Sequence, residues 1–140
     1  MIIIFVSRGP GLCGNTVLNR MWQYGKRVLF LSGAKLKIFE KHNRKMMTML
    51  VEREDSQYSY RNTLVAMDGD QVVGISVSYD GGKLRQLRLA FIEAAKEYLG
   101  KDHSGMEDET QAGEFYLDSL AVLPEYRRQG IYKYFFTYLA

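Results

Sequence analysis

The sequence contains very little proline and cysteine. Two prolines in 140 residues and no long polar tract leave little room for a disordered linker, and no repeat of fixed period is present. Cys13 is the single cysteine, so the chain cannot form an internal disulfide and nothing points to an oxidising compartment. We therefore expect one domain, residues 1–140, in the cytoplasm.

Long apolar runs and a strong excess of one charge are also lacking. The apolar run at residues 1–6 is too short for a signal-peptide core or a membrane span, so no membrane partner is expected. The net charge of +3 is too weak, and its residues too scattered, to favour nucleic acid as a partner. His42 and His103 have no partner at the spacing of metal ligands, so no metal site is expected.

What the sequence does contain is enough apolar and aromatic residues, 46% and 13%, to build a core. The β-branched run at residues 2–6 predicts a buried strand, and the following Gly9, Pro10 and Gly11 predict a turn. A short helix is expected over residues 16–24, residues 28–31 are ambiguous, and a longer helix is expected over residues 36–53.

The second half of the sequence has clearer patterns. The tripeptide Asp68-Gly69-Asp70, between β-rich runs at 62–67 and 71–79, predicts an antiparallel hairpin. Apolar residues at helical spacing predict a helix over 84–99, closed by Gly100. A polar, acidic loop over 101–113 and a strand over 114–122 follow, and an apolar helix begins after Gly130. Strict alternation along that strand predicts two faces: Tyr116, Asp118, Leu120 and Val122 on one, and Phe115, Leu117, Ser119 and Ala121 on the other.

The segment from Tyr116 to Tyr132, YLDSLAVLPEYRRQGIY, resembles motif A of the GNAT superfamily of N-acetyltransferases. The signature of that motif is Arg or Gln, two residues, Gly, one residue, then Gly or Ala, and here it falls on Arg127 to Tyr132. The hairpin and the helix over 84–99 lie where the family places its second and third strands and the helix before its fourth strand. The resemblance covers about residues 63–136 and implies an α/β (α+β) fold, with a mixed, mainly antiparallel sheet flanked by helices.

The resemblance implies that the chain uses acetyl-CoA as a co-substrate. A helix N-terminus offers unpaired N–H groups and the positive end of the helix dipole to a pyrophosphate. Glycine lets the backbone approach the phosphates closely. The edge of the strand would pair with the pantetheine arm. The residues implied in coenzyme binding are Leu120, Ala121, Val122, Arg127, Arg128, Gln129, Gly130, Ile131 and Tyr132. Tyr132 departs from the family, which has Gly or Ala there, and its ring would crowd the pyrophosphate unless it points away along the helix.

The resemblance also implies transfer of the acetyl group to a primary amine by direct attack, with a carboxylate as the base. Asp118 is the preferred carboxylate, Glu114 is the second, and Tyr116 is expected on their strand face. The candidates for the acceptor pocket are Tyr58, Tyr60, Arg61 and Tyr79. Small amines, amino acids, antibiotics and protein amino groups all stay open as acceptors. The acidic residues of the loop 102–109 either attract a cationic amine or are simply solvated.

Two further interpretations stay open. The chain ends at Ala140, ten residues after Gly130, whereas the family continues with a fifth strand, a helix and a hairpin. The resemblance thus implies an incomplete domain with an exposed strand edge that favours self-association, or a non-catalytic module that binds acyl-CoA. A remote alternative is a nucleotide binder, because residues 9–16 have the spacing of a phosphate-binding P-loop, with Asn15 in place of its lysine.

Overall fold

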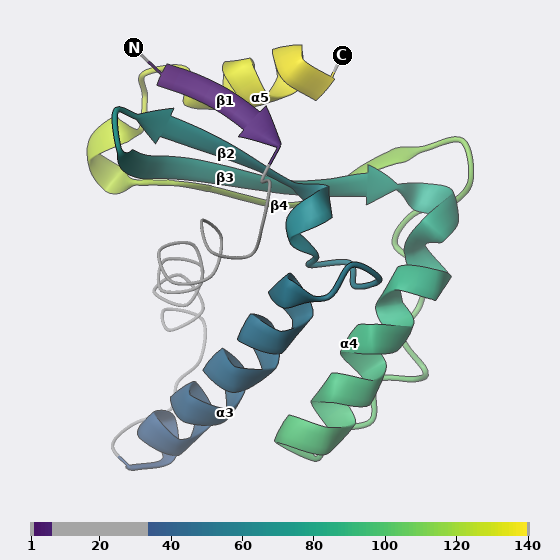
Figure 1. Cartoon of the computed structure of the whole chain (residues 1–140). Helices are drawn as coiled ribbons and strands as arrows, with labels where there is room; N and C mark the ends of the chain where they lie inside the picture. The colour runs from purple at the N-terminus through teal and green to yellow at the C-terminus, as the bar shows by residue number, and fades with distance from the viewer. Residues whose placement is uncertain (1, 7–33, 140) are drawn as a thin grey trace.

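The structure is a computed structural model that describes residues 2–6 and 34–139. Its elements, in chain order, are β1 (Ile2–Val6), α3 (Ala34–Glu52), the 3₁₀ turn η1 (Tyr60–Asn62), β2 (Thr63–Asp68), β3 (Gln71–Asp80), the 3₁₀ turn η2 (Gly81–Lys83), α4 (Leu84–Leu99), β4 (Phe115–Val122), the 3₁₀ turn η3 (Pro124–Tyr126) and α5 (Ile131–Leu139) (Figure 1). The P-loop-like turn, the helix expected over 16–24 and the ambiguous residues 28–31 lie outside the described residues.

The four described strands form one sheet in the order β1-β2-β3-β4, and each pairing is antiparallel. Helices α3 and α4 lie on one face of this sheet, and α5 lies on the other (Figure 1). The expected α/β class, with an antiparallel sheet flanked by helices, is confirmed. Because β4 is last in the order, its outer edge carries no further strand among the described residues.

Local chemistry accounts for the boundaries of the predicted elements. The β2–β3 hairpin turns at Gly69, which has a φ of 57°, as the Asp-Gly signal predicts. Helix α4 ends at Gly100, whose φ is 64° and whose N–H bonds the carbonyls of Ala95 and Lys96. The strand predicted at residues 2–6 matches β1, and the helices predicted over 36–53 and after Gly130 match α3 and α5. None of the helices in the described part of the chain is both long and apolar enough to span a membrane.

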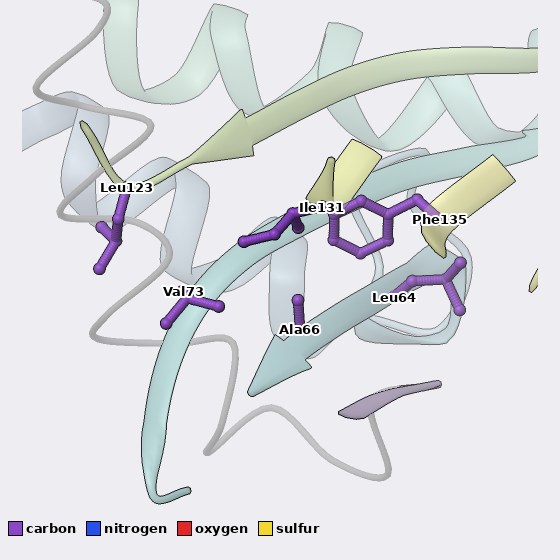
Figure 2. Packing of buried hydrophobic residues seen from close by; sticks show 6 residues of the cluster. All are labelled: Leu64, Ala66, Val73, Leu123, Ile131 and Phe135. Carbon is purple, nitrogen blue, oxygen red and sulfur yellow. The ribbon is translucent and has the colours of Figure 1, made fainter. Parts of the chain in front are cut away.

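Apolar side chains fill both faces of the sheet. On the face toward α3, Val65, Val72, Ile75 and Val77 of the sheet pack with Val51 of the helix. The opposite face buries Leu64, Ala66 and Val73 of the sheet together with Leu123, Ile131 and Phe135 (Figure 2). Leu123 and Ile131 lie on either side of residues 124–130, so burial of both side chains fixes the two ends of this loop.

A β-bulge in β4 overturns the predicted alternation of that strand. Ser119 pairs with Val77 and Leu117 pairs with Ser78, so Asp118 is an extra residue without a partner in β3. Ala121 packs against the α3-side cluster, whereas Val122 packs against the α5-side cluster. The prediction that Tyr116, Asp118, Leu120 and Val122 share one face is therefore wrong, because the bulge changes the phase of the strand between its two halves.

Candidate functional site

Asp118 is a partly buried carboxylate held by three side chains. Its Oδ2 accepts hydrogen bonds from the Tyr79 hydroxyl at 3.1 Å and from Gln57 Nε2 at 3.2 Å, and its Oδ1 accepts one from Ser119 Oγ at 3.2 Å. Burial raises the pKa of Asp118, and the three hydrogen bonds oppose that rise without cancelling it. The bulge thus presents a carboxylate that is more basic than a solvated aspartate, which suits a general base.

Two tyrosines extend the site from Asp118 along the sheet. The rings of Tyr79 and Tyr116 pack edge to face, with their centroids 5.7 Å apart. The Tyr116 hydroxyl donates to Glu109 Oε2 at 2.7 Å, and this bond raises the pKa of Tyr116 to about 12. Burial, followed by the charge of Asp118, raises the pKa of Tyr79. Both hydroxyls therefore stay protonated at neutral pH and act as donors to carboxylates.

Gln57 and Tyr58 close the site on the side of the helices. The ring of Tyr58 packs edge to face on Phe91 of α4 at 6.0 Å, and burial raises the pKa of its hydroxyl, with the charge of Asp118 adding to the effect. Gln57 is only 6% exposed. Its Nε2 donates to Asp118, and its Oε1 has no hydrogen-bond partner.

Three predicted site residues have contacts elsewhere. The Tyr60 hydroxyl donates to Glu54 Oε1 at 3.1 Å, and Arg61 Nη2 lies 2.8 Å from the same oxygen. Glu114 accepts hydrogen bonds from Thr110 Oγ1 and from the backbone and side chain of Gln111, and these bonds lower its pKa. The structure thus brings together Tyr58, Tyr79, Tyr116 and Asp118, and it assigns Glu114, Tyr60 and Arg61 to other contacts.

Sequence reasoning did not single out Gln57 or Glu109. Gln57 lies in the polar stretch before the hairpin, which has no periodicity, and only its hydrogen bond to Asp118 identifies it. Glu109 belongs to the acidic loop and was one of several equivalent carboxylates in the sequence. Its bond to Tyr116 distinguishes it from its neighbours.

The loop after β4 has an unusual backbone. Arg128 has a φ of 63°, which is uncommon for a residue with a side chain, and Gly130 has a φ of 77°. Arg127 Nε donates to the carbonyl of Val122 at 3.1 Å, and Gln129 Nε2 donates to the carbonyl of Glu125 at 3.0 Å. These side chains bond back to the backbone of the loop and stabilise the turn that leads into α5.

The start of α5 has free space beside its backbone among the described residues. The first N–H groups of a helix have no partner within it, and Ile131 is the first residue of α5. A Cβ at Gly130 would meet only Lys133 Cδ, at 3.8 Å, so the space beside the backbone is free among the described residues. The ring of Tyr132 packs edge to face on Phe136, one turn further along α5. Tyr132 is 47% exposed, so its ring lies at the surface of α5 rather than in the core.

The edge of β4 beside this loop is partly accessible. Leu120 is 42% exposed, and Ala121 and Val122 are half-buried. The outer edge of β4, which has no partner strand among the described residues, is followed directly in the chain by the loop and the N-terminus of α5. No group of three or more His, Cys, Asp or Glu side chains that could hold a metal ion occurs among residues 2–6 and 34–139.

No protein-family model and no curated protein matches the sequence. Solved structures do match it. A crystal structure of an acetyltransferase aligns with a TM-score of 0.69 and 19% identity, over 98% of this chain and 71% of that one. The crystal structure of an N-acetyltransferase from Staphylococcus aureus Mu50 aligns with a TM-score of 0.66 and 18% identity, over 98% of this chain and 74% of that one. The chain therefore shares its fold with solved structures of acetyltransferases.

Proposed function

We propose that this chain is an N-acetyltransferase that transfers an acetyl group from acetyl-CoA to a primary amine by direct attack. The observation that carries the proposal is the position of Asp118. A carboxylate with a raised pKa lies in a bulge of the edge strand whose end leads into the loop and the N-terminus of α5. The fold shared with acetyltransferases supports it.

In this proposal the loop after β4 holds the pyrophosphate of the coenzyme. Backbone N–H groups from Arg128 to Tyr132 would bind the phosphate oxygens, and the guanidinium groups of Arg127 and Arg128 would add positive charge. The edge of β4 at residues 120–122 would pair with the pantetheine arm as an added strand. A backbone N–H of this edge would polarise the thioester carbonyl, which stabilises the charge that develops on its oxygen.

Asp118 would act on the acceptor. A primary amine is protonated at neutral pH and must lose a proton before or during attack. Asp118 would accept this proton, and Tyr79 and Gln57 would hold its carboxylate in place. The nitrogen then forms a bond to the carbonyl carbon and the carbon–sulfur bond breaks. The nitrogen releases its second excess proton to solvent to give the neutral amide, and the thiolate takes a proton from solvent.

Release of free thiol from acetyl-CoA in the presence of a primary amine tests this function. Asp118→Asn keeps the size of the side chain but cannot accept the proton, so transfer should fall by about a hundredfold or more while acetyl-CoA still binds. Asp102→Asn, at an exposed carboxylate of the loop, serves as the matched control and should keep full activity.

Three results separate the possible functions. Transfer by Asp118→Asn at the rate of the unmodified chain would remove Asp118 from the mechanism. Binding of acetyl-CoA by the unmodified chain without thiol release for any amine would instead indicate the non-catalytic acyl-CoA-binding module. Absence of both binding and release would contradict the proposed function altogether.

A further inference from the structure

The candidate site contains a second carboxylate, that of Glu109. Tyr116 donates to Glu109 at 2.7 Å and Tyr79 donates to Asp118 at 3.1 Å, while the two tyrosine rings pack against each other. Each carboxylate is thus fixed by one member of a tyrosine pair. Asp118 is partly buried and Glu109 is exposed, so one carboxylate lies inside the site and the other lies toward solvent.

An unpaired oxygen lies beside the inner carboxylate. Gln57 is 6% exposed and donates to Asp118 through Nε2, but the oxygen of the same amide has no hydrogen-bond partner. A buried acceptor without a donor costs free energy. Asp118 and this amide oxygen are both acceptors, so the inner end of the site is suited to an N–H donor rather than to an anion.

Two arginines of α4, Arg85 and Arg88, bond to the acidic loop beside the site. Arg88 is 4% exposed, and its Nη1 donates to the carbonyls of Met106 and Glu107 and lies 3.5 Å from Asp108. Arg85 Nε also lies 2.7 Å from Asp108. Arg88 is buried under the loop that it holds, its Nε has no hydrogen-bond partner, and its charge acts on the pKa of Tyr116, so it partly offsets the negative charge of the two carboxylates. Among the described residues, the charged groups that accept hydrogen bonds from the two site tyrosines are the carboxylates Asp118 and Glu109.

We propose that the preferred acceptor is a short diamine, whose reacting nitrogen lies at Asp118 and whose far ammonium group lies at Glu109. This inference rests on the proposed transferase function. The far ammonium would form a charge-assisted hydrogen bond with Glu109 and pack against the tyrosine rings. A monoamine of the same length lacks this contact, and an amino acid would place its carboxylate against Glu109.

The test compares three series of acceptors with matched chain lengths. These are the terminal diamines of propane, butane and pentane, the corresponding monoamines, and the corresponding ω-amino acids. The readout is kcat/KM for thiol release from acetyl-CoA. At the best chain length, the diamine should exceed the monoamine by about fivefold, which corresponds to the upper range for an exposed ion pair. The amino acid should be the poorest acceptor.

Variants of the loop separate the role of Glu109 from a general effect of charge. Glu109→Gln should reduce the ratio of diamine to monoamine kcat/KM to about one, and Tyr116→Phe should also lower it, because the hydrogen bond that places Glu109 is lost. Glu107→Gln removes an exposed charge from the same loop and should leave the ratio unchanged.

The outcomes distinguish this inference from the function on which it rests. Equal kcat/KM for diamines and monoamines in the unmodified chain, or an unchanged ratio in Glu109→Gln, would overturn the diamine assignment while the transferase stands. If no amine of any series released thiol, both proposals would fall together.

Discussion

At the scale of single residues, burial raises the pKa of Asp118, and the hydrogen bond from Tyr79 is the largest of the contacts that oppose this rise. A donor to a carboxylate favours its ionised form, so this bond lowers the pKa of Asp118 against the rise caused by burial. Tyr79→Phe removes the donor and keeps the ring. We expect the pKa of Asp118 to rise further, and the acid limb of the pH dependence of kcat/KM to move to higher pH.

Tyr126→Phe is the matched control for this change. The Tyr126 hydroxyl donates to Asp68 Oδ2 at 2.7 Å, a carboxylate at the β2–β3 turn rather than in the site. Its removal should leave both the Asp118 titration and the pH profile unchanged. The titration is followed by NMR of the labelled carboxyl carbon, and an unshifted Asp118 in Tyr79→Phe would contradict the role of the hydrogen bond.

The sequence predicts part of this residue-scale picture. Asp118 and Tyr79 are found from the strand pattern and from the family resemblance, and the structure joins them by a hydrogen bond. Gln57 and Glu109 are not found, because their importance comes from contacts between segments far apart in the chain. The prediction that Tyr116, Asp118, Leu120 and Val122 share one face is wrong for a related reason. The alternation of residues along one strand does not indicate a bulge, which appears only in the pairing with β3.

At the scale of elements, the turn after β3 packs tightly against the end of the acidic loop. The N–H of Gly81 donates to the carbonyl of Glu114 at 2.7 Å. A Cβ on Gly81 would lie 2.5 Å from the carbonyl oxygen of Gln111 and would also collide with Thr110 Oγ1. Gly81→Ala should therefore lower the free energy of unfolding by about 1–3 kcal/mol, measured by urea denaturation.

Gly105→Ala is the control for this substitution. Gly105 lies in the same loop between α4 and β4, and a Cβ there meets nothing within 4 Å. Its free energy of unfolding should change by less than about 0.5 kcal/mol. Equal free energies of unfolding for the two variants would contradict the predicted steric clash at Gly81, because the backbone of the loop would then move to accept a Cβ.

Arg88 of α4 forms hydrogen bonds with the acidic loop at residues 101–113. The buried guanidinium donates to two loop carbonyls, and these bonds are lost in Arg88→Leu. We expect a loss of about 1–3 kcal/mol in stability and faster amide hydrogen exchange over residues 103–110. Arg85→Leu removes an exposed partner of the same Asp108 and should cost less than about 1 kcal/mol. Equal exchange rates in both variants would contradict this role of Arg88.

The elements themselves are largely predictable from local signals. The Asp-Gly turn, the glycine after α4 and the switch from helical to alternating periodicity place the hairpin, α4 and β4 close to their observed bounds. The exposed face of α5 is not predictable in this way. Its sequence is apolar or aromatic almost all round, so periodicity does not identify a buried side. In the structure Ile131 and Phe135 are buried, whereas Tyr132, Tyr134, Phe136 and Tyr138 are each about half-exposed.

At the scale of the whole molecule, one face of the sheet carries the proposed base, and the other face fixes the loop proposed for the coenzyme. The face toward α3 and α4 carries Asp118 and its tyrosines, and burial of Leu123 and Ile131 on the α5 side fixes the loop proposed for the coenzyme. Strand β4 connects the two, because its bulge holds Asp118 and its end enters the loop. Self-association through the outer edge of β4, which carries no further strand in the part of the chain that the structure describes, stays a prediction.

The central claim is that this loop and the start of α5 bind the coenzyme, and calorimetric titration with acetyl-CoA tests it most directly. In Gly130→Glu, a carboxylate would repel and block the pyrophosphate at the N-terminus of α5. In Gly105→Glu the same charge enters the distant acidic loop. We expect saturable binding by the unmodified chain and by Gly105→Glu, and binding at least about tenfold weaker, or lost, in Gly130→Glu, with circular dichroism confirming that each variant is folded. Equal binding by all three chains, or no binding by the folded unmodified chain, would contradict the account.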